Sequence, residues 1–153
     1  MQYRPYKPED FEALYALEEV CFQPPFRFGR GYMRSVVRRA NAATWIAAEE
    51  DGTIAGFAIV LWEKRRGGIW AYIETLEVRL ELRGRGTGGE LLRRCEESAR
   101  AANVESIWLH VDSENDAAMR LYRSHGFERL GRVEGYYPEG RAAEVYAKML
   151  MAQ

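Results

Sequence analysis

Apolar residues recur along this chain with two kinds of spacing, which predict helices in some stretches and strands in others. A repeat every three to four residues marks one face of a helix, and short runs rich in β-branched and aromatic residues are typical of strands. The first spacing predicts four helices: about Pro8–Phe22, about Tyr32–Ala40, a stretch around Leu91 that ends near Ala102, and Asn115–His125. The second predicts seven strands: Gln2–Tyr6, Thr44–Glu49, Thr53–Trp62, Ile69–Val78, Ser106–Asp112, Phe127–Glu134 and Ala143–Leu150.

Residues that favour turns separate these elements. Asp51-Gly52 predicts a tight hairpin, and the prolines and glycines of Gln23–Gly31 predict a loop between the first two helices. The resulting order is β-α-α-β-β-β-α-β-α-β-β. Tight turns join antiparallel strands and helical crossovers join parallel ones. We therefore expect an α/β (α+β) fold, with a mixed sheet of about seven strands flanked by four helices, as one domain over residues 1–153.

Composition and charge narrow the functional classes. The chain has 153 residues, a formal net charge of −1 and 47% hydrophobic residues, which is typical of a globular domain. This charge gives no general electrostatic basis for binding nucleic acid or an anionic membrane. No apolar run approaches the ~20 residues that span a bilayer, and the N-terminus has no hydrophobic signal region. With Cys21 and Cys95 expected to be reduced thiols, we expect a cytoplasmic protein.

The stretch Val78–Leu92 combines a strand end, a glycine-rich turn and the start of a helix. Such a turn directs several backbone N–H groups at one point, where the positive end of the helix dipole adds to them. Gly84, Gly86 and Gly88 carry no Cβ, so a phosphate can approach the main chain closely. The stretch predicts a pyrophosphate-binding site, although a glycine-rich turn without a ligand would have the same local pattern.

The kind of pyrophosphate follows from the motif around these glycines. A kinase-type loop, G-x-x-x-x-G-K-[ST], needs a lysine, and the chain has none between Lys64 and Lys148. A dinucleotide fingerprint needs an acidic residue at a second strand end about 20 positions further on, which the sequence does not clearly supply. Instead, R-x-x-G-x-G at Arg83–Gly88, preceded by L-x-V at Leu76–Val78, resembles the coenzyme A signature of the GNAT superfamily of N-acetyltransferases. The resemblance implies an acetyl-CoA site formed by Leu76, Glu77, Val78, Arg83, Gly84, Arg85, Gly86, Thr87, Gly88, Gly89, Asn115 and Tyr122.

A second motif lies downstream. Asn115–Phe127 reads N-D-A-A-M-R-L-Y-R-S-H-G-F and fits the family pattern N-x-x-A-x-x-L-Y-x-x-x-G-F at every fixed position. The predicted element order is also that of the GNAT fold, so the resemblance covers nearly the whole chain. It is closest to the N-terminal-amine branch, the RimI-like and Naa-type enzymes. The features shared with that branch are C-F at Cys21-Phe22 before a proline-rich loop and Y-Y-x-x-G-R at Tyr136–Arg141.

The resemblance implies an enzyme that transfers acetyl directly from acetyl-CoA to an amine, with no metal. The expected acceptor is a protein or peptide N-terminus, and the expected oligomeric state is monomer or homodimer. A small-molecule amine is the alternative acceptor. A catalytically silent acyl-CoA-binding domain is an alternative from another class. Neither cysteine lies in a Cys/His arrangement that would indicate a nucleophile, and Cys95 shares the apolar stripe of a helix, so it is expected in the core.

Direct transfer requires a base for the amine and an acid for the departing thiolate. The resemblance names Tyr122 as the acid, although a tyrosine on this amphipathic helix would also suit the core. For the base we expect a water held by His110, in L-H-V, and Tyr72, in Y-I-x-T-L. Glu74 is the rival base, because regular alternation places Tyr72, Glu74 and Leu76 on one face of their strand. Both His110 and Glu74 would also be compatible with ordinary polar positions of a sheet.

Two loops are expected to border the acceptor groove. By resemblance, the residues that would contact the acceptor are Phe22, Phe26, Arg27, Tyr136 and Tyr137. Aromatic residues in loops are also common as lids over a core, and this structural role is the alternative to acceptor binding. An α-amine has a reference pKa of about 7.7–8.0, so a histidine near 6.5 can deprotonate it, whereas a lysine side chain near 10.4 is a harder acceptor.

Overall fold

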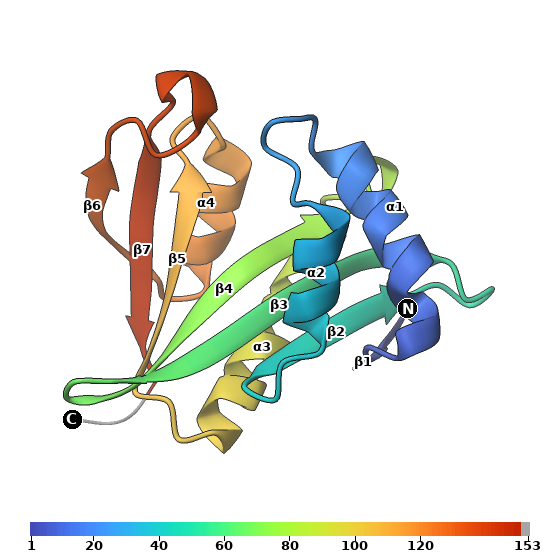
Figure 1. Ribbon diagram of the computed structural model, residues 1–153, viewed down its shortest axis with the longest axis horizontal. Coiled ribbons are helices and arrows are strands. Elements are labelled where there is room, and N and C mark those ends of the chain that lie inside the picture. The colour runs from blue at the N-terminus through green and yellow to red at the C-terminus, as the bar shows by residue number, and fades with distance from the viewer. Residues whose placement is uncertain (151–153) are drawn as a thin grey trace.

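A computed structural model of the chain describes residues 1–150, which form a seven-stranded mixed sheet with helices on both faces (Figure 1). The strand order across the sheet is β1-β2-β3-β4-β5-β7-β6. The strands are β1 (Gln2–Pro5), β2 (Ala42–Ala48), β3 (Ile54–Arg65), β4 (Gly68–Val78), β5 (Ser106–Asp112), β6 (Glu128–Val133) and β7 (Ala143–Met149). β4 and β5 are parallel, and the other neighbouring pairs are antiparallel. The expected mixed sheet is confirmed.

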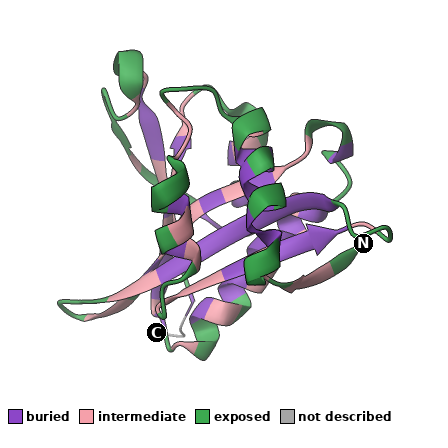
Figure 2. Ribbon diagram, turned by 45° about the vertical axis from the view of Figure 1, so that its right-hand side comes forward, coloured by how far each residue is buried: buried purple, intermediate pink, exposed green. Residues whose placement is uncertain are grey.

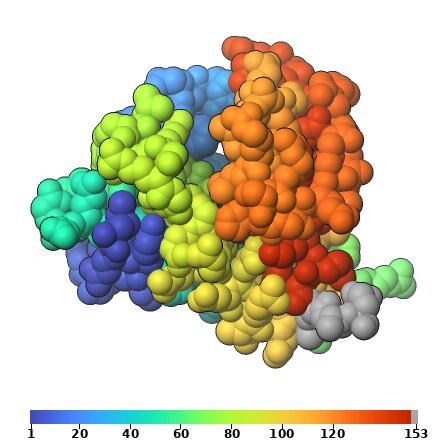
Figure 3. All heavy atoms as spheres, turned by 180° about the vertical axis from the view of Figure 1, so that it is seen from behind, coloured from blue at the N-terminus to red at the C-terminus, as the bar shows by residue number. Residues whose placement is uncertain are grey.

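The four expected helices are present in the expected order. α1 (Phe11–Cys21) and α2 (Arg30–Val37) cover one face of the sheet. α3 (Thr87–Ala101) and α4 (Asp116–Ser124) cover the other, and both lie toward the viewer in Figure 3. No helix within residues 1–150 is both long and apolar enough to cross a membrane.

The second helix differs in its bounds from the sequence prediction. It occupies Arg30–Val37 rather than Tyr32–Ala40, so Ala40, which the periodicity places on the buried face, is exposed. The helix ends early because the N–H of Arg38 turns back to carbonyls of the preceding turn, which tightens the last turn and releases the chain toward β2. An early end of this kind depends on backbone geometry, which apolar spacing does not report.

Two further boundaries depend on backbone hydrogen bonds. Residues Pro8–Asp10, predicted as the first helical turn, form a separate 3₁₀ turn before α1. β3 continues to Arg65, beyond the apolar run that predicts its end at Trp62. The extension occurs because the ladder to β4 is made by backbone groups, whatever side chains the strand carries.

The apolar residues form one cluster on each face of the sheet. On the first face, α1 and α2 pack on β2 and β3 through buried residues that include Leu14, Leu17, Met33, Val36, Ile46, Phe57 and Ile59. On the second face, α3 packs through Leu91, Leu92, Cys95 and Ala99. Figure 2 shows the central strands buried and the outer faces of the helices exposed. The prediction that Cys95 belongs to the core is confirmed.

The feature that positions the site is the separation of β4 from β5. These two strands pair only from Trp70↔Ser106 to Tyr72↔Trp108, although β4 continues to Val78 and β5 to Asp112. Beyond Tyr72 the two halves of the sheet diverge, as the gap between the β4 and β5 ribbons in Figure 1 shows. Side chains of both strands therefore point into a shared opening at the centre of the sheet.

Candidate active site

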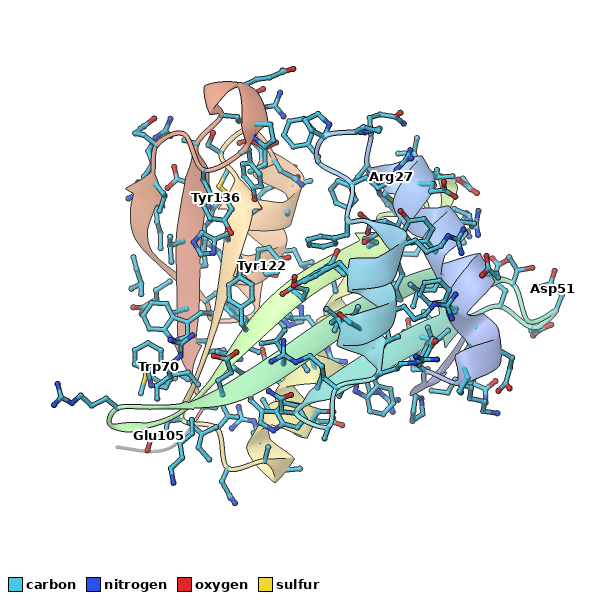
Figure 4. The ribbon with its side chains drawn as sticks, viewed as in Figure 1. Arg27, Asp51, Trp70, Glu105, Tyr122 and Tyr136 are labelled. Atoms are coloured by element: carbon cyan, nitrogen blue, oxygen red, sulfur yellow. The ribbon has the colours of Figure 1, made fainter. Side chains whose placement is uncertain are left out.

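A cleft of about 1060 Å³ lies at the opening between β4 and β5. The sequence-predicted residues that line it are Phe22, Phe26, Tyr72, Glu74, Leu76, His110, Asn115, Tyr122, Tyr136 and Tyr137. The other predicted residues lie outside this lining: Arg27, Glu77, Val78 and Arg83–Gly89. In Figure 4, Tyr122 and Tyr136 project toward the opening from the half of the sheet that contains β5.

Tyr72 and His110 meet across the opening. The Tyr72 hydroxyl and the His110 Nδ1 lie 2.7 Å apart, within hydrogen-bond distance. The ring of Tyr136 stacks on the imidazole, with centroids 4.3 Å apart and planes 6° from parallel. The imidazole is thus held on two sides by β4 and by the loop before β7, which fixes its orientation.

This arrangement suits a histidine that accepts a proton. Burial lowers the pKa of His110 below its usual 6.5, so the imidazole is neutral at neutral pH. Burial also raises the pKa of Tyr72, so its phenol stays protonated. With the imidazole proton on Nδ1, that N–H donates to the Tyr72 oxygen, and the Nε2 lone pair is free to receive a proton.

Glu74 is arranged differently from the prediction. The ladder to β3 shifts between Ile59, opposite Thr75, and Val60, opposite Ile73, so Glu74 forms a bulge without a partner. The bulge breaks the alternation that would place Tyr72, Glu74 and Leu76 on one face. Leu76 instead packs on the α3 side of the sheet, and that part of the prediction is wrong.

The Glu74 carboxylate is engaged by α2. The Tyr32 hydroxyl donates to its Oε1 at 2.6 Å. Burial, and then this hydrogen bond to the carboxylate, raise the pKa of Tyr32 to about 12. Glu74 therefore lines the cleft with one oxygen occupied, while the Tyr72–His110 pair forms a separate unit.

Tyr122 supplies a free phenol to the same cleft. Its side chain comes from α4 and is 6% exposed, and its ring packs against Phe127 and Tyr146. Within residues 1–150 its hydroxyl makes no hydrogen bond, unlike the hydroxyls of Tyr32, Tyr72 and Tyr146. Burial raises the pKa of Tyr122, so the phenol keeps its proton at neutral pH. The arrangement places an available O–H donor in the cleft that also contains His110.

The glycine-rich turn is built as the sequence predicts. Gly84 and Gly86 have φ values of +78° and +85°, which side-chain-bearing residues rarely adopt. Of the groups that the structure describes, none accepts a hydrogen bond from the N–H of residues 84–89, and α3 begins at Thr87. Free N–H groups at the start of a fifteen-residue helix are suited to an anion. The Arg83 Nε donates to the Val78 carbonyl at 2.8 Å and ties this turn to the end of β4.

The next two glycines have a second role in packing. A Cβ on Gly89 would lie 2.8 Å from the His125 ring, and one on Gly88 would lie 3.3 Å from the Leu121 side chain. These contacts show that the two glycines let α4 approach α3 closely. Asn115 caps α4, since its Oδ1 accepts from the Ala118 N–H at 3.0 Å, and it lies at the edge of the cleft.

The α1–α2 loop and the loop before β7 meet above the cleft. The Phe26 and Tyr137 rings lie 6.1 Å apart, and Tyr137 meets Tyr136 edge to face at 4.9 Å. Arg27, labelled in Figure 4, points back to α1, where it donates to the carbonyls of Phe22 and Glu19. Arg27 thus caps the C-terminal end of α1, whereas the aromatic residues of both loops cover the cleft.

Several residues around the cleft have no counterpart in the sequence prediction. Tyr32, Trp70, Trp108 and Arg141 line it. Arg141 bonds Asp112 at 2.8 Å. Arg141 ends the Y-Y-x-x-G-R motif but is not among the expected site residues. No local motif marks the other three, because each belongs to an element whose neighbours are far away in the chain. The one available signal was the alternation on β4, which places Trp70 on the same face as Tyr72.

Two buried carboxyl groups form a pair: Glu18 of α1, which lines the cleft, and Glu77 of β4, which does not. They are 0% and 2% exposed. Thr75 donates to the Glu77 Oε2 at 2.7 Å and the Phe28 N–H to the Glu18 Oε2 at 3.0 Å. The Oε1 atom of each glutamate has no hydrogen-bond partner among residues 1–150. Burial, and then the neighbouring Glu18 carboxyl, raise the pKa of Glu77 well above its usual value, so folded Glu77 keeps its proton to higher pH than an exposed glutamate does.

Glu77→Gln is therefore expected to raise the unfolding temperature at about pH 8 and to flatten its dependence on pH. The unfolded glutamate loses its proton near 4.3, while folded Glu77 keeps it to higher pH. The folded state then binds more protons, so stability falls as pH rises from about 4.3 through the folded-state pKa. A neutral glutamine removes that loss. Thermal unfolding measured over this pH range tests the expectation.

Glu97→Gln is the matched control for this prediction. Glu97 is an exposed residue of α3, and its replacement should leave the pH dependence of unfolding as in the original chain. If Glu77→Gln lowered the unfolding temperature by the same amount at every pH, Glu77 would be an ionised, satisfied carboxylate in the folded state, contrary to its raised pKa.

Comparison with known proteins gives one family. Residues 11–127 match the model described as the acetyltransferase (GNAT) family. The chain is 35% identical over 108 residues to streptothricin acetyltransferase of Streptomyces lavendulae, covering 69% of the chain and 54% of that protein. It is 37% identical over 93 residues to N-alpha-acetyltransferase RimI of Mycobacterium tuberculosis, covering 61% and 57%. The chain thus spans about half the length of the curated relatives it matches.

Solved structures share the fold. Arabidopsis thaliana Naa50, in complex with the bisubstrate analogue CoA-Ac-MVNAL, superimposes with a TM-score of 0.82 and 28% identity. The match covers 96% of this chain and 97% of that one. The seven-stranded sheet and four helices described above are therefore the arrangement found in a structure that holds a coenzyme A–peptide conjugate.

Proposed function

The chain belongs to the GNAT family of acetyltransferases, and from this premise we propose that it transfers the acetyl group of acetyl-CoA directly to the α-amino group of a peptide or protein N-terminus. One observation carries the proposal: a proton acceptor, the Tyr72–His110 pair, and a proton donor, Tyr122, line one cleft. The similarity to RimI and to Naa50 with its peptide conjugate supports this acceptor class.

The glycine-rich turn fits the pyrophosphate of acetyl-CoA. The N–H groups of Gly84–Gly89 lack acceptors within the described chain, and the positive φ of Gly84 and Gly86 leaves their outer side open. Leu76, Asn115 and Tyr122 line the cleft, and the Leu76 side chain also lies next to Gly88 of this turn, so we assign these three residues to the rest of the cosubstrate. When bound, acetyl-CoA supplies an acyl group activated as a thioester. The chain's own residues supply the proton transfers.

Gly86→Val is expected to weaken acetyl-CoA binding by about tenfold or more. At φ +85° a β-branched residue is strained by about 1–3 kcal/mol, so the turn must change shape to accept it. Calorimetry on folded protein measures the affinity. Gly52→Val is the control, because Gly52 has φ +89° and open space in the β2–β3 hairpin. Should both variants bind acetyl-CoA equally well, the turn is not the pyrophosphate site.

The base and acid follow from the protonation states in the cleft. A neutral His110 takes a proton from the incoming ammonium, directly or through a water shared with Tyr72, and the free amine attacks the acyl carbon. The bond from the acyl carbon to sulfur breaks, and Tyr122 donates its proton to the departing sulfur. The new amide nitrogen loses its surplus proton, which restores the Tyr122 phenol. Cys21 lines the cleft, but burial raises the pKa of its thiol to about 11, so it is not a thiolate at neutral pH. Direct transfer is therefore favoured over an acyl-enzyme.

The choice of an α-amine follows from acidity. An α-amino group has a reference pKa of about 7.7–8.0 and a lysine side chain about 10.4. A histidine whose pKa is lowered is a weak base, so it deprotonates the α-amine far more readily than a lysine.

A small-molecule amine is the second candidate acceptor, and one observation favours it: the 35% identity to streptothricin acetyltransferase. A non-catalytic acyl-CoA-binding role is disfavoured, because such a domain has no use for a free phenol in the same cleft as a neutral imidazole. We further propose that the protein works in the cytoplasm as one domain over residues 1–153, of which 151–153 lie outside the described residues. The free thiols of Cys21 and Cys95 suit that compartment.

Release of coenzyme A distinguishes these functions. The assay compares peptides with a free N-terminus, the same peptides with a blocked N-terminus, and small amines that include streptothricin. We expect release only with the free peptides. Release with small amines alone would make the small-molecule reaction the function. Binding of acetyl-CoA without release for any acceptor would favour the non-catalytic domain.

A further inference from the structure

The end of the cleft farthest from the glycine-rich turn contains two stacked tryptophans. Trp70, near the start of β4, and Trp108 of β5 have ring centroids 5.2 Å apart and planes 13° from parallel. Trp70 is 40% exposed although it lies at the centre of the sheet, and Figure 4 shows it at the base of the opening. The Trp108 Nε1 donates to the Ser106 Oγ at 2.8 Å, which fixes that indole. We call these two side chains the tryptophan platform.

The platform continues the surface on which Tyr72 lies. Tyr72 pairs with Leu61 and Trp70 with Glu63 in the β3–β4 ladder, so the two aromatic residues occupy the same face of β4. Trp70, Tyr72 and their ladder partners Glu63 and Leu61 all line the cleft. Alternate residues of a strand are about 6.6–6.8 Å apart. An extended peptide advances by about the same distance in two residues, so a chain whose α-amine lies at His110 reaches the platform with its third residue.

Charged side chains continue the cleft beyond the platform. Arg39 and Arg65 lie 3.6 Å and 3.0 Å from the Glu63 carboxylate. Two guanidinium groups around one carboxylate leave a surplus of positive charge at this mouth of the cleft. The pairs are exposed, so little free energy holds the Arg65 side chain to Glu63, and it is available to an acidic group of a ligand.

We propose that the tryptophan platform is a specificity subsite for the third residue of a peptide acceptor, which accepts an apolar or aromatic side chain, and that Arg65 favours an acidic residue directly after it. The inference rests on the proposed function and names the peptide class. Three features support it: the exposed indole of Trp70 in a cleft, the spacing from His110, and the charge beyond the platform. The fold itself does not require Trp70, whose ring lies outside both apolar clusters of the described residues.

The test compares a dipeptide with a hexapeptide that shares its first two residues and carries leucine third and glutamate fourth. Trp70→Ala should lower kcat/KM for the hexapeptide about tenfold, mainly through KM, and leave that for the dipeptide unchanged. Trp70→Phe should restore most of the loss, since it keeps an aromatic face. Acetyl-CoA affinity, measured by calorimetry, should be the same in all three proteins and confirms folding.

Arg65 has a matched control in its neighbour. Arg65→Ala should lower kcat/KM for the glutamate peptide about threefold and not for a glutamine version, whereas Arg66→Ala, outside the cleft lining, should affect neither. If Trp70→Ala lowered kcat/KM equally for the dipeptide and the hexapeptide, or lowered it for neither, the proposed subsite would be wrong. If the unmodified enzyme acetylates no peptide but acetylates small amines, the proposed function fails first and the subsite with it.

Discussion

Replacing Tyr122 by phenylalanine is expected to lower turnover by about 10²–10⁴-fold, the range typical of a lost general acid, while acetyl-CoA affinity stays nearly unchanged. The substitution removes only the hydroxyl, which makes no hydrogen bond within residues 1–150. Packing against Phe127 and Tyr146 is kept. The loss should therefore appear in kcat and not in stability. Steady-state rates, calorimetry and thermal unfolding together check this expectation.

Tyr146→Phe is the matched control. Tyr146 is 1% exposed, packs against the Tyr122 ring and accepts a hydrogen bond from Arg123, but it does not line the cleft. Its replacement should cost some stability and leave kcat within about twofold. Near-normal turnover in Tyr122→Phe would mean that the thiolate leaves without an enzyme acid. Tyr122 would then be a core residue.

The second large effect is expected for His110→Ala. Removal of a general base should lower kcat by about 10²-fold or more at neutral pH. In the unaltered enzyme, kcat should rise with pH through a value below the usual 6.5 of histidine, because burial lowers the pKa of His110 and only the neutral imidazole accepts a proton. The variant should lack this rise. The measurement is a pH–rate profile at saturating acceptor, where the ionisation of the bound complex is observed.

Two companion variants separate His110 from Glu74. Tyr72→Phe should damage the same limb of the profile, since the Tyr72 hydroxyl contacts the His110 Nδ1 at 2.7 Å. The double variant should then resemble the worse single one, because the two residues act as a unit. Glu74→Gln should have little effect on turnover. Loss of turnover in Glu74→Gln with near-normal rates in His110→Ala would instead identify the carboxylate as the base.

Much of the fold could be predicted because its signals are local. Helical spacing, the Asp51-Gly52 turn and the glycines after Arg83 each act within a few residues, and together they predict the element order and the glycine-rich turn that begins α3. The meeting of Tyr72 with His110 was also within reach, since alternation orients side chains on each strand once the two strands are neighbours.

The features that could not be predicted depend on register and on contacts between distant segments. The bulge at Glu74, which sends Leu76 to the other face, is fixed by how β4 pairs with β3. The Glu18–Glu77 pair joins α1 to β4, and nothing in either local sequence distinguishes a buried glutamate from an exposed one. Arg27 reads as a charged loop residue, but only the path of its loop shows that it turns back to cap α1.

The most direct test of the central claim uses a peptide with one free α-amino group and one internal lysine. After incubation with acetyl-CoA and the enzyme, fragmentation mass spectrometry locates the added acetyl group. The account predicts acetylation of the α-amine alone, abolished by Tyr122→Phe and by blocking the N-terminus. Acetyl on the lysine Nζ, or an unmodified peptide under conditions in which a small amine such as streptothricin is acetylated, would contradict it.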